Sequence, residues 1–157
     1  MHYIVLDFEW NQPLSEKEMI TEPFPFDSEI IEIGAVKLDE SFHSVDEFKT
    51  FIRPQFYPHM SNAVVQLTKI RPQELEKAPS FSEAFDAFID WCGDDCALCS
   101  WGPDDIPVLL DNMLLHAIPT EPFPYCYDLQ RIFARELLRE NRQCSLADAV
   151  KMLNLPA

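Results

Sequence analysis

The sequence predicts an α/β fold in which one mixed five-stranded sheet is flanked by helices. Three strand-like runs lie before about residue 60, and beyond it helical and strand-like runs alternate. Because three strands precede the first helix, we expect them to be antiparallel, and the two later strands to be parallel. The 157 residues suffice for a single domain.

The strands are predicted from short runs rich in β-branched and aromatic residues. They cover residues 3–8, 29–38, 47–52, 97–101 and 125–127. The segment 11–28 has three prolines among polar residues, which indicates a connection over the surface.

Helices are predicted where apolar residues recur every three or four positions. They cover residues 61–67, 72–75, 80–91, 106–116, 129–140 and 145–153. Ser80 and Glu83 form a capping box at the start of the third helix, and Ser145 is the expected N-cap of the last.

Composition and charge narrow the class of protein. Hydrophobic residues make up 47% of the chain, as in folded globular proteins. No run approaches the roughly 18 apolar residues of a membrane span, and no signal peptide is recognisable, so we expect a cytoplasmic protein with no membrane partner. The net charge of −15 argues against a protein that coats nucleic acid through Lys and Arg. It does not argue against a nuclease that holds phosphates through divalent cations, because the metal ions reverse the local sign.

The cysteines are odd in number and are predicted to be reduced, mainly buried thiols. They are Cys92, Cys96, Cys99, Cys126 and Cys144. The first three are spaced closely enough to suggest zinc, but no fourth ligand follows at an ordinary spacing.

The acidic pair at the end of the first strand is the most informative feature for function. Asp7 and Glu9 point to the same face of a strand, and Phe8 points to the other. Two neighbouring carboxylates repel each other unless a cation lies between them, and Mg²⁺ and Mn²⁺ prefer such oxygen ligands. The alternative is a pair of solvated acids at the end of a strand.

A second acidic site follows the fourth strand. Asp104 and Asp105 lie where that strand turns into a helix, at the edge of the sheet where α/β folds place their ligands. Either residue is also a candidate helix cap, so both roles are open here.

Several blocks of the chain resemble the DEDDh (DnaQ-like) 3′-5′ exonucleases, in particular the branch with the 3′ histone-mRNA exonuclease and its bacterial relatives. The blocks are Asp7-Phe8-Glu9, EIIEIGAV at 29–36, Arg53-Pro54, LTKI at 67–70, APSF at 78–81 and SWGPDD at 100–105. They span nearly the entire chain in the family's order. The resemblance implies a ribonuclease H-like fold, and it implies that Asp7, Glu9 and Asp105 are catalytic metal ligands. Asp105 is preferred over Asp104 because the family pattern is similar to S-W-G-x-x-D.

The resemblance also implies a third motif, a histidine followed five residues later by an aspartate, which this sequence lacks. His2, His43, His59 and His116 lie in the wrong places, and none of them precedes an acid at that spacing in the right region of the chain. We therefore expect the domain to be incomplete at Ala157 and the natural chain to continue. The alternative is a member of the family that has lost its catalytic base.

By this resemblance the protein is a 3′-5′ exonuclease that uses two Mg²⁺ or Mn²⁺ ions to hydrolyse phosphodiester bonds. The expected partner is a single-stranded nucleic acid with a free 3′ end, RNA in preference to DNA. The substrate contacts that we predict are Phe8, Trp10, Thr68 and Trp101. Arg131, Arg135 and Arg139 share a helical face, but the interleaved glutamates favour a solvated face over a phosphate track.

Two rival functions remain. One is a catalytically inactive ribonuclease H-like module that binds nucleic acid or protein. The other is a different metal-dependent phosphoesterase, for which the sequence offers neither a His-rich ligand set nor a glycine-rich phosphate loop.

Overall fold

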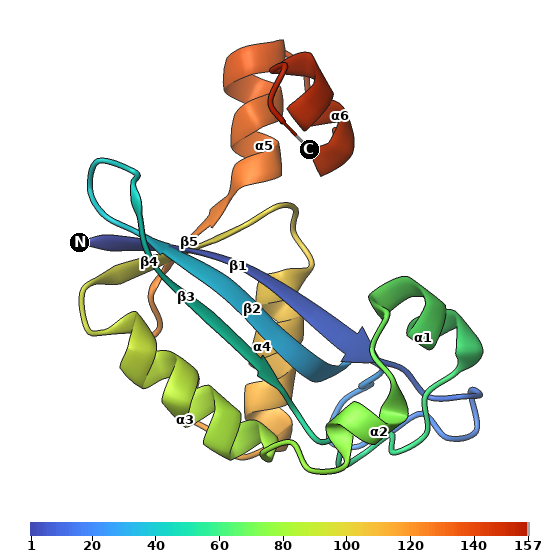
Figure 1. The fold of residues 1–157 in the computed structure, drawn as a ribbon. Coiled ribbons are helices and arrows are strands. Elements are labelled where there is room, and N and C mark those ends of the chain that lie inside the picture. The colour runs from blue at the N-terminus through green and yellow to red at the C-terminus, as the bar shows by residue number, and fades with distance from the viewer. Residues whose placement is uncertain (157) are drawn as a thin grey trace.

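The computed structural model describes residues 1–156 and contains one five-stranded sheet (Figure 1). Its strands are β1 (His2–Asn11), β2 (Glu29–Leu38), β3 (Ser44–Phe51), β4 (Cys96–Ser100) and β5 (Tyr125–Asp128). The strand order is β3-β2-β1-β4-β5, with antiparallel pairing among the first three strands and parallel pairing of β1 with β4 and of β4 with β5. The predicted mixed sheet is confirmed, and β1 lies at its centre.

The helices are short and most have a recognisable cap. They are α1 (Asn62–Thr68), α2 (Pro72–Leu75), α3 (Phe81–Cys92), α4 (Asp105–Leu115), α5 (Leu129–Phe133), η1 (Ala134–Leu138) and α6 (Leu146–Met152). The predicted capping box at Ser80 and Glu83 is present, and α3 ends at Gly93, whose φ of 78° favours glycine. None of the helices within residues 1–156 is long and apolar enough to cross a bilayer.

The main core lies between one face of the sheet and helices α3 and α4. Ile4, Leu6 and Phe8 of β1 point into it and are at most 4% exposed. Phe88 of α3 and Leu109 of α4 are fully buried against them. Since strand side chains alternate, the odd-numbered residues of β1 lie on the opposite face.

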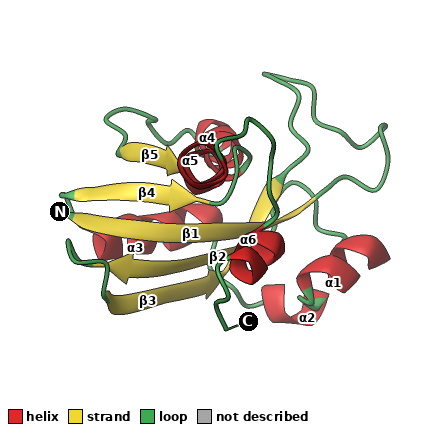
Figure 2. Cartoon of the chain, turned by 90° about the horizontal axis from the view of Figure 1, so that it is seen from above, coloured by secondary structure: helices red, strands yellow, loops and turns green. Residues whose placement is uncertain are grey.

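Helices α5 and α6 lie on the other side of the sheet from α3 (Figure 1). They have a small core of their own, made by Phe133, Cys144 and Ala149 and packed against Trp101. The carboxyl ends of β4 and β5 point to the same edge of the sheet, near the start of α5 (Figure 2).

The segment predicted as one helix over 129–140 departs from expectation. It begins as α5, continues from Ala134 to Leu138 as a π-helix, and ends at Arg139 in the left-handed conformation. In an α-helix each backbone N–H bonds to the carbonyl four residues earlier, and in a π-helix to the carbonyl five residues earlier. The spacing of apolar residues does not distinguish the two, so the sequence could not reveal the π-helix.

Candidate active site

Asp7 and Glu9 lie toward the carboxyl end of β1, on the face opposite the core. Phe8, between them, is 3% exposed and packs inside the core, whereas Asp7 is exposed and Glu9 is partly buried. The predicted placement of both carboxylates on one face agrees with this burial pattern.

The neighbouring strand β2 has no side chain opposite Asp7. Gly34 of β2 lies opposite Asp7, and a Cβ at Gly34 would meet the Asp7 carbonyl oxygen at 3.6 Å. Glu9 lies opposite Glu32, whose carboxylate is 3.2 Å from the Lys49 ammonium. The pairing register shifts directly after Glu9, and such bulges are frequent next to active sites.

Asp105 is joined to this pair through the backbone of Phe8. It is the first residue of α4, is 7% exposed, and its Oδ1 accepts a hydrogen bond of 3.1 Å from the Phe8 N–H. Asp104 is exposed, and its side chain makes no capping hydrogen bond. The structure therefore distinguishes the two aspartates: Asp105 is buried and bonded to β1, and Asp104 is exposed.

The charges of the three carboxylates oppose one another. Burial raises the pKa of Asp105 to about 6, and the Asp7 charge adds to this rise while the Phe8 N–H opposes it. Desolvation also raises the pKa of Asp7 and of Glu9, and for Glu9 the charges of Asp7, Glu32 and Asp105 contribute further. The unliganded cluster is therefore electrostatically unfavourable, and a cation among the carboxylates would relieve it.

The donor set fits a hard divalent cation, because carboxylate oxygens are the ligands that Mg²⁺ and Mn²⁺ prefer. As the side chains stand, no group of three or more His, Cys, Asp or Glu side chains within residues 1–156 is placed to hold an ion. Binding would therefore require the carboxylates of Asp7, Glu9 and Asp105 to turn toward a common point.

The raised pKa of Asp105 predicts how stability depends on pH without metal. The folded state releases this proton near pH 6, and the unfolded chain releases it near the ordinary value of 3.8. The free energy of unfolding should therefore fall as pH rises between these values, by ~3 kcal/mol at most for this group. Asp105→Asn should remove this part of the slope and make the protein more stable than wild type at pH 7 in EDTA.

Urea unfolding between pH 4 and pH 8 measures this effect, with Asp104→Asn as the matched control. Asp104 is exposed, so its replacement should leave the pH dependence close to that of wild type. Identical slopes for wild type and Asp105→Asn would show that Asp105 ionises normally in the folded protein.

Two buried polar residues that the sequence did not single out position the site. Asn112 of α4 is fully buried; its side chain accepts from the Ile30 N–H at 3.1 Å and donates to the Ser28 carbonyl at 2.8 Å. These bonds fix the helix that begins with Asp105 to β2. A polar residue on the buried face of an apolar helix was the signal that could have identified Asn112.

Glu29 is the second of these residues and is 2% exposed. Its carboxylate accepts hydrogen bonds from the backbone N–H groups of Gln55, Phe56 and Tyr57, at 2.5, 2.9 and 2.6 Å. Burial raises its pKa, and the three donors oppose that rise. Glu29 thereby fixes the segment between β3 and α1, and no local sequence signal marks this role.

The predicted substrate contacts differ in how buried their side chains are and in what those side chains contact. The Phe8 ring is buried in the core, so the prediction that it contacts a base is wrong for this structure, because no face of the ring is open to solvent. Trp10 is partly buried against the main core. The Trp101 indole N–H donates to the Cys144 carbonyl at 3.0 Å, and its ring packs on Phe133.

Thr68, the remaining predicted contact, lies at the end of α1. Its hydroxyl donates to the Val64 carbonyl at 2.9 Å and accepts from the Ile70 N–H at 3.2 Å. The hydroxyl thus stabilises the helix end. Leu67 beside it is 80% exposed and is the more accessible side chain of the two.

Histidines and cysteines make no contribution to this cluster in the described chain. Within residues 1–156, no histidine forms a hydrogen bond or ion pair with Asp7, Glu9 or Asp105. His116 stacks on Phe81 with ring centroids 4.7 Å apart, and burial lowers its pKa. All five cysteines are free thiols.

Comparison with known proteins gives matches along the whole chain. The sequence profile of a family described as Exonuclease (RNase_T) matches residues 4–156. The 3′-5′ exonuclease eri1 of Schizosaccharomyces pombe (strain 972 / ATCC 24843) is 36% identical over 64 residues. That stretch is 40% of this chain and only 22% of the length of the relative.

Solved structures share the fold. The nuclease domain of 3′hExo, a DEDDh family member bound to rAMP, superposes with a TM-score of 0.81 at 22% identity, over 98% of this chain and 79% of that chain. The cell-death related nuclease 4 (CRN-4) superposes with a TM-score of 0.77 at 20% identity, over 99% and 55% of the two chains. The predicted ribonuclease H-like architecture is confirmed by these likenesses.

Proposed function

The chain belongs to the Exonuclease (RNase_T) family, and we propose that it removes nucleotides one at a time from the 3′ end of a single-stranded nucleic acid. The observation that supports this most strongly is the hydrogen bond from the Phe8 N–H to Asp105. It joins a buried carboxylate on α4 to the strand that holds Asp7 and Glu9. Three mutually repelling carboxylates at one sheet edge suit a metal-dependent phosphodiesterase.

In this proposal Asp7, Glu9 and Asp105 hold two Mg²⁺ or Mn²⁺ ions beside the scissile phosphate. Such ions supply an activated water and neutralise negative charge on the phosphate. The chain's own contribution is to fix the ligands. Phe8 orients Asp105 through its backbone, and Asn112 fixes α4 against β2.

We propose RNA as the substrate in preference to DNA. The support comes from the family members with the same fold: one was solved with rAMP, and another is described as recognising the 3′ end of a histone mRNA stem-loop. A site that contacts the 2′-hydroxyl distinguishes RNA from DNA.

A second candidate function is a nucleic-acid-binding module without catalysis. It is favoured by the lack of any histidine bonded to the three carboxylates within residues 1–156, since a general base is needed to take the proton of the attacking water.

The test is a time course with a single-stranded RNA labelled at its 5′ end, in Mn²⁺ and in EDTA. We expect a ladder that shortens from the 3′ end in Mn²⁺ only. The DNA strand of the same sequence should shorten about tenfold more slowly, the effect of one lost hydrogen bond. Internal cuts would refute an exonuclease. Tight binding with no shortening in either condition would favour the noncatalytic module.

A further inference from the structure

The segment 131–142 carries more positive than negative side chains, although the chain as a whole is acidic. It holds four arginines (Arg131, Arg135, Arg139 and Arg142) and two glutamates, whereas the chain as a whole has a net charge of −15. A local excess of positive charge in such a protein attracts anions to one place.

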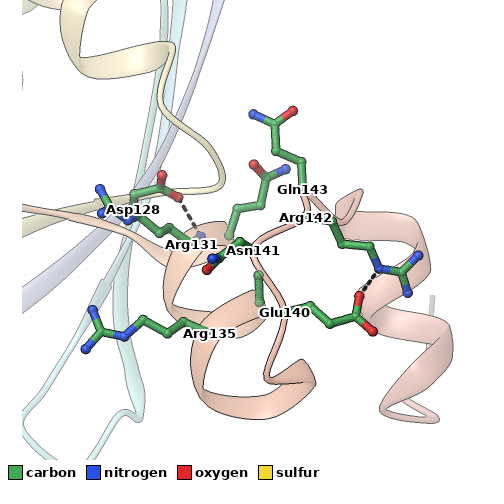
Figure 3. Close-up of a pocket in the computed structure, with 9 residues that line it drawn as sticks. Asp128, Arg131, Arg135, Glu140, Asn141, Arg142 and Gln143 are labelled. Carbon is green, nitrogen blue, oxygen red and sulfur yellow. Dashed lines mark hydrogen bonds and ion pairs between the residues drawn. The ribbon is translucent and has the colours of Figure 1, made fainter.

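A polar cavity of about 560 Å³ lies along this segment (Figure 3). Side chains with N–H donors dominate its lining: Gln130, Arg131, Arg135, Asn141, Arg142 and Gln143. Arginine and amide donors are the groups that bind phosphate oxygens in proteins. The chemistry of the lining is therefore that of a phosphate site.

Two acids also line the cavity, and both have partners. Asp128 caps α5, and its Oδ1 accepts from the Arg131 N–H at 3.0 Å. Glu140 pairs with Arg142 on the far side of the segment from Arg135 (Figure 3). Asp128 thus caps α5 and Glu140 is paired with Arg142. Arg131 and Arg135 are the other cations of the lining, and of these Arg135 is paired with its neighbour Glu136.

Arg131 and Arg135 also line a second cavity of about 300 Å³, together with Tyr127 and the acids Asp128 and Glu136. The Arg131 side chain has no ion-pair partner within residues 1–156, and Arg135 contacts only Glu136, at 3.4 Å between Nε and Oε1. The two arginines therefore line two adjoining cavities. A single strand of nucleic acid that passed through both cavities would contact them.

The smaller cavity and Asp7 share one face of the sheet. Val5 of β1 pairs with Cys99 of β4, which pairs with Tyr127 of β5, so Tyr127 lies on the same face of the sheet as Val5 and Asp7. Two strand spacings separate β1 from β5, which is about 10 Å. A single strand of nucleic acid that crosses this face from β5 to β1 would pass from the cavity toward Asp7.

The backbone of the segment is unusual as well. The π-helix Ala134–Leu138 contains Arg135 and directly follows the turn that carries Arg131. Such turns are frequent at functional sites.

We propose that Arg131 and Arg135 bind phosphate groups of the single strand whose 3′ end lies at Asp7, Glu9 and Asp105. The proposal rests on the proposed nuclease function for the identity of the ligand. Tyr127 offers its 43% exposed side chain as a surface for a base next to those phosphates.

The test is the double variant Arg131→Gln/Arg135→Gln, with binding of a fluorescent 12-nucleotide RNA strand measured by anisotropy in EDTA. For single strands each phosphate contact changes log K by about 0.7 per decade of salt. Loss of two contacts should lower the magnitude of the salt slope by about 1.4 and weaken binding about 25-fold at 0.1 M salt. Arg139→Gln is the control: it removes one positive charge from the same segment, where the double variant removes two, and Arg139 does not line either cavity.

Two further measurements separate this proposal from its rivals. A mononucleotide should bind the double variant and wild type equally; an equal loss for mononucleotide and strand would mean a free-phosphate site and overturn the proposal. A polyglutamate peptide that displaces the RNA as well as unlabelled RNA does would point to an acidic protein partner and overturn it too. Equal weakening by Arg139→Gln would show a nonspecific charge effect and no site.

The outcome is independent of catalysis. Hydrolysis of a p-nitrophenyl nucleotide ester by the wild-type protein in Mn²⁺ reports on the carboxylates and is measured separately from RNA binding. If wild type fails to hydrolyse this ester, the nuclease proposal fails, while RNA binding in EDTA still decides whether the two arginines hold a strand.

Discussion

Replacement of Asp7 by asparagine is expected to reduce the rate of trimming from the 3′ end by about 10³-fold, equivalent to ~4 kcal/mol of transition-state stabilisation. Asp7 is exposed on the open face of β1, and its charge raises the pKa of both Glu9 and Asp105. Its charge thus acts on both of the other carboxylates. Asparagine keeps the size of the side chain and removes one anionic ligand, so metal binding should weaken while the fold is kept.

The measurement is the initial rate with 5′-labelled RNA at saturating Mn²⁺, together with urea unfolding of each variant. Asp104→Asn is the control, because Asp104 is an exposed acid next to the site that makes no bond to it. Wild-type trimming by Asp7→Asn would exclude Asp7 as a metal ligand. An equal loss in Asp104→Asn would mean that net charge near the site, and no specific ligand, governs the rate.

Replacement of Glu29 by alanine is expected to lower the free energy of unfolding by ~3–5 kcal/mol. The three backbone N–H groups of residues 55–57 would lose their acceptor at the edge of the core. Each unsatisfied buried donor costs ~1–3 kcal/mol, and water can replace the acceptor only at the part-buried positions. This loss exceeds what an exposed glutamate contributes, which is at most ~1 kcal/mol.

Urea unfolding at pH 7 measures the difference, with two comparisons. Glu29→Gln retains a single carbonyl acceptor in place of two carboxylate oxygens and should recover part of the lost stability. Glu76→Ala replaces an exposed glutamate at the end of α2 and should change stability by less than ~0.5 kcal/mol. A change of that small size for Glu29→Ala would show that the segment between β3 and α1 is held by other contacts.

Much of the fold could be predicted because its strands and helices have strong local signals. The run of β-branched residues at 29–38 and the capping box at Ser80 predicted elements that the structure contains. Predictions were weaker at element ends, where β1 extends to Asn11 and β3 begins at Ser44, because the polar ends of strands have no distinctive pattern.

The candidate site was predictable in part. Alternation in one strand was enough to place Asp7 and Glu9 together, and the burial of Asp105 agrees with the choice of that residue over Asp104. The hydrogen bond from the Phe8 backbone to Asp105 joins residues 97 positions apart, so no local pattern could reveal it. The Phe8 ring was assigned to the substrate because aromatic residues near a site can stack on bases, yet in this structure the ring belongs to the core.

The proposed function requires divalent ions at the carboxylate cluster, and the most direct test is a crystal soaked in Mn²⁺ and measured at the manganese absorption edge. We expect anomalous density bounded by the carboxylates of Asp7, Glu9 and Asp105, which is lost in Asp105→Asn crystals. No density at those side chains in wild type, with the three carboxylates still apart, would contradict it.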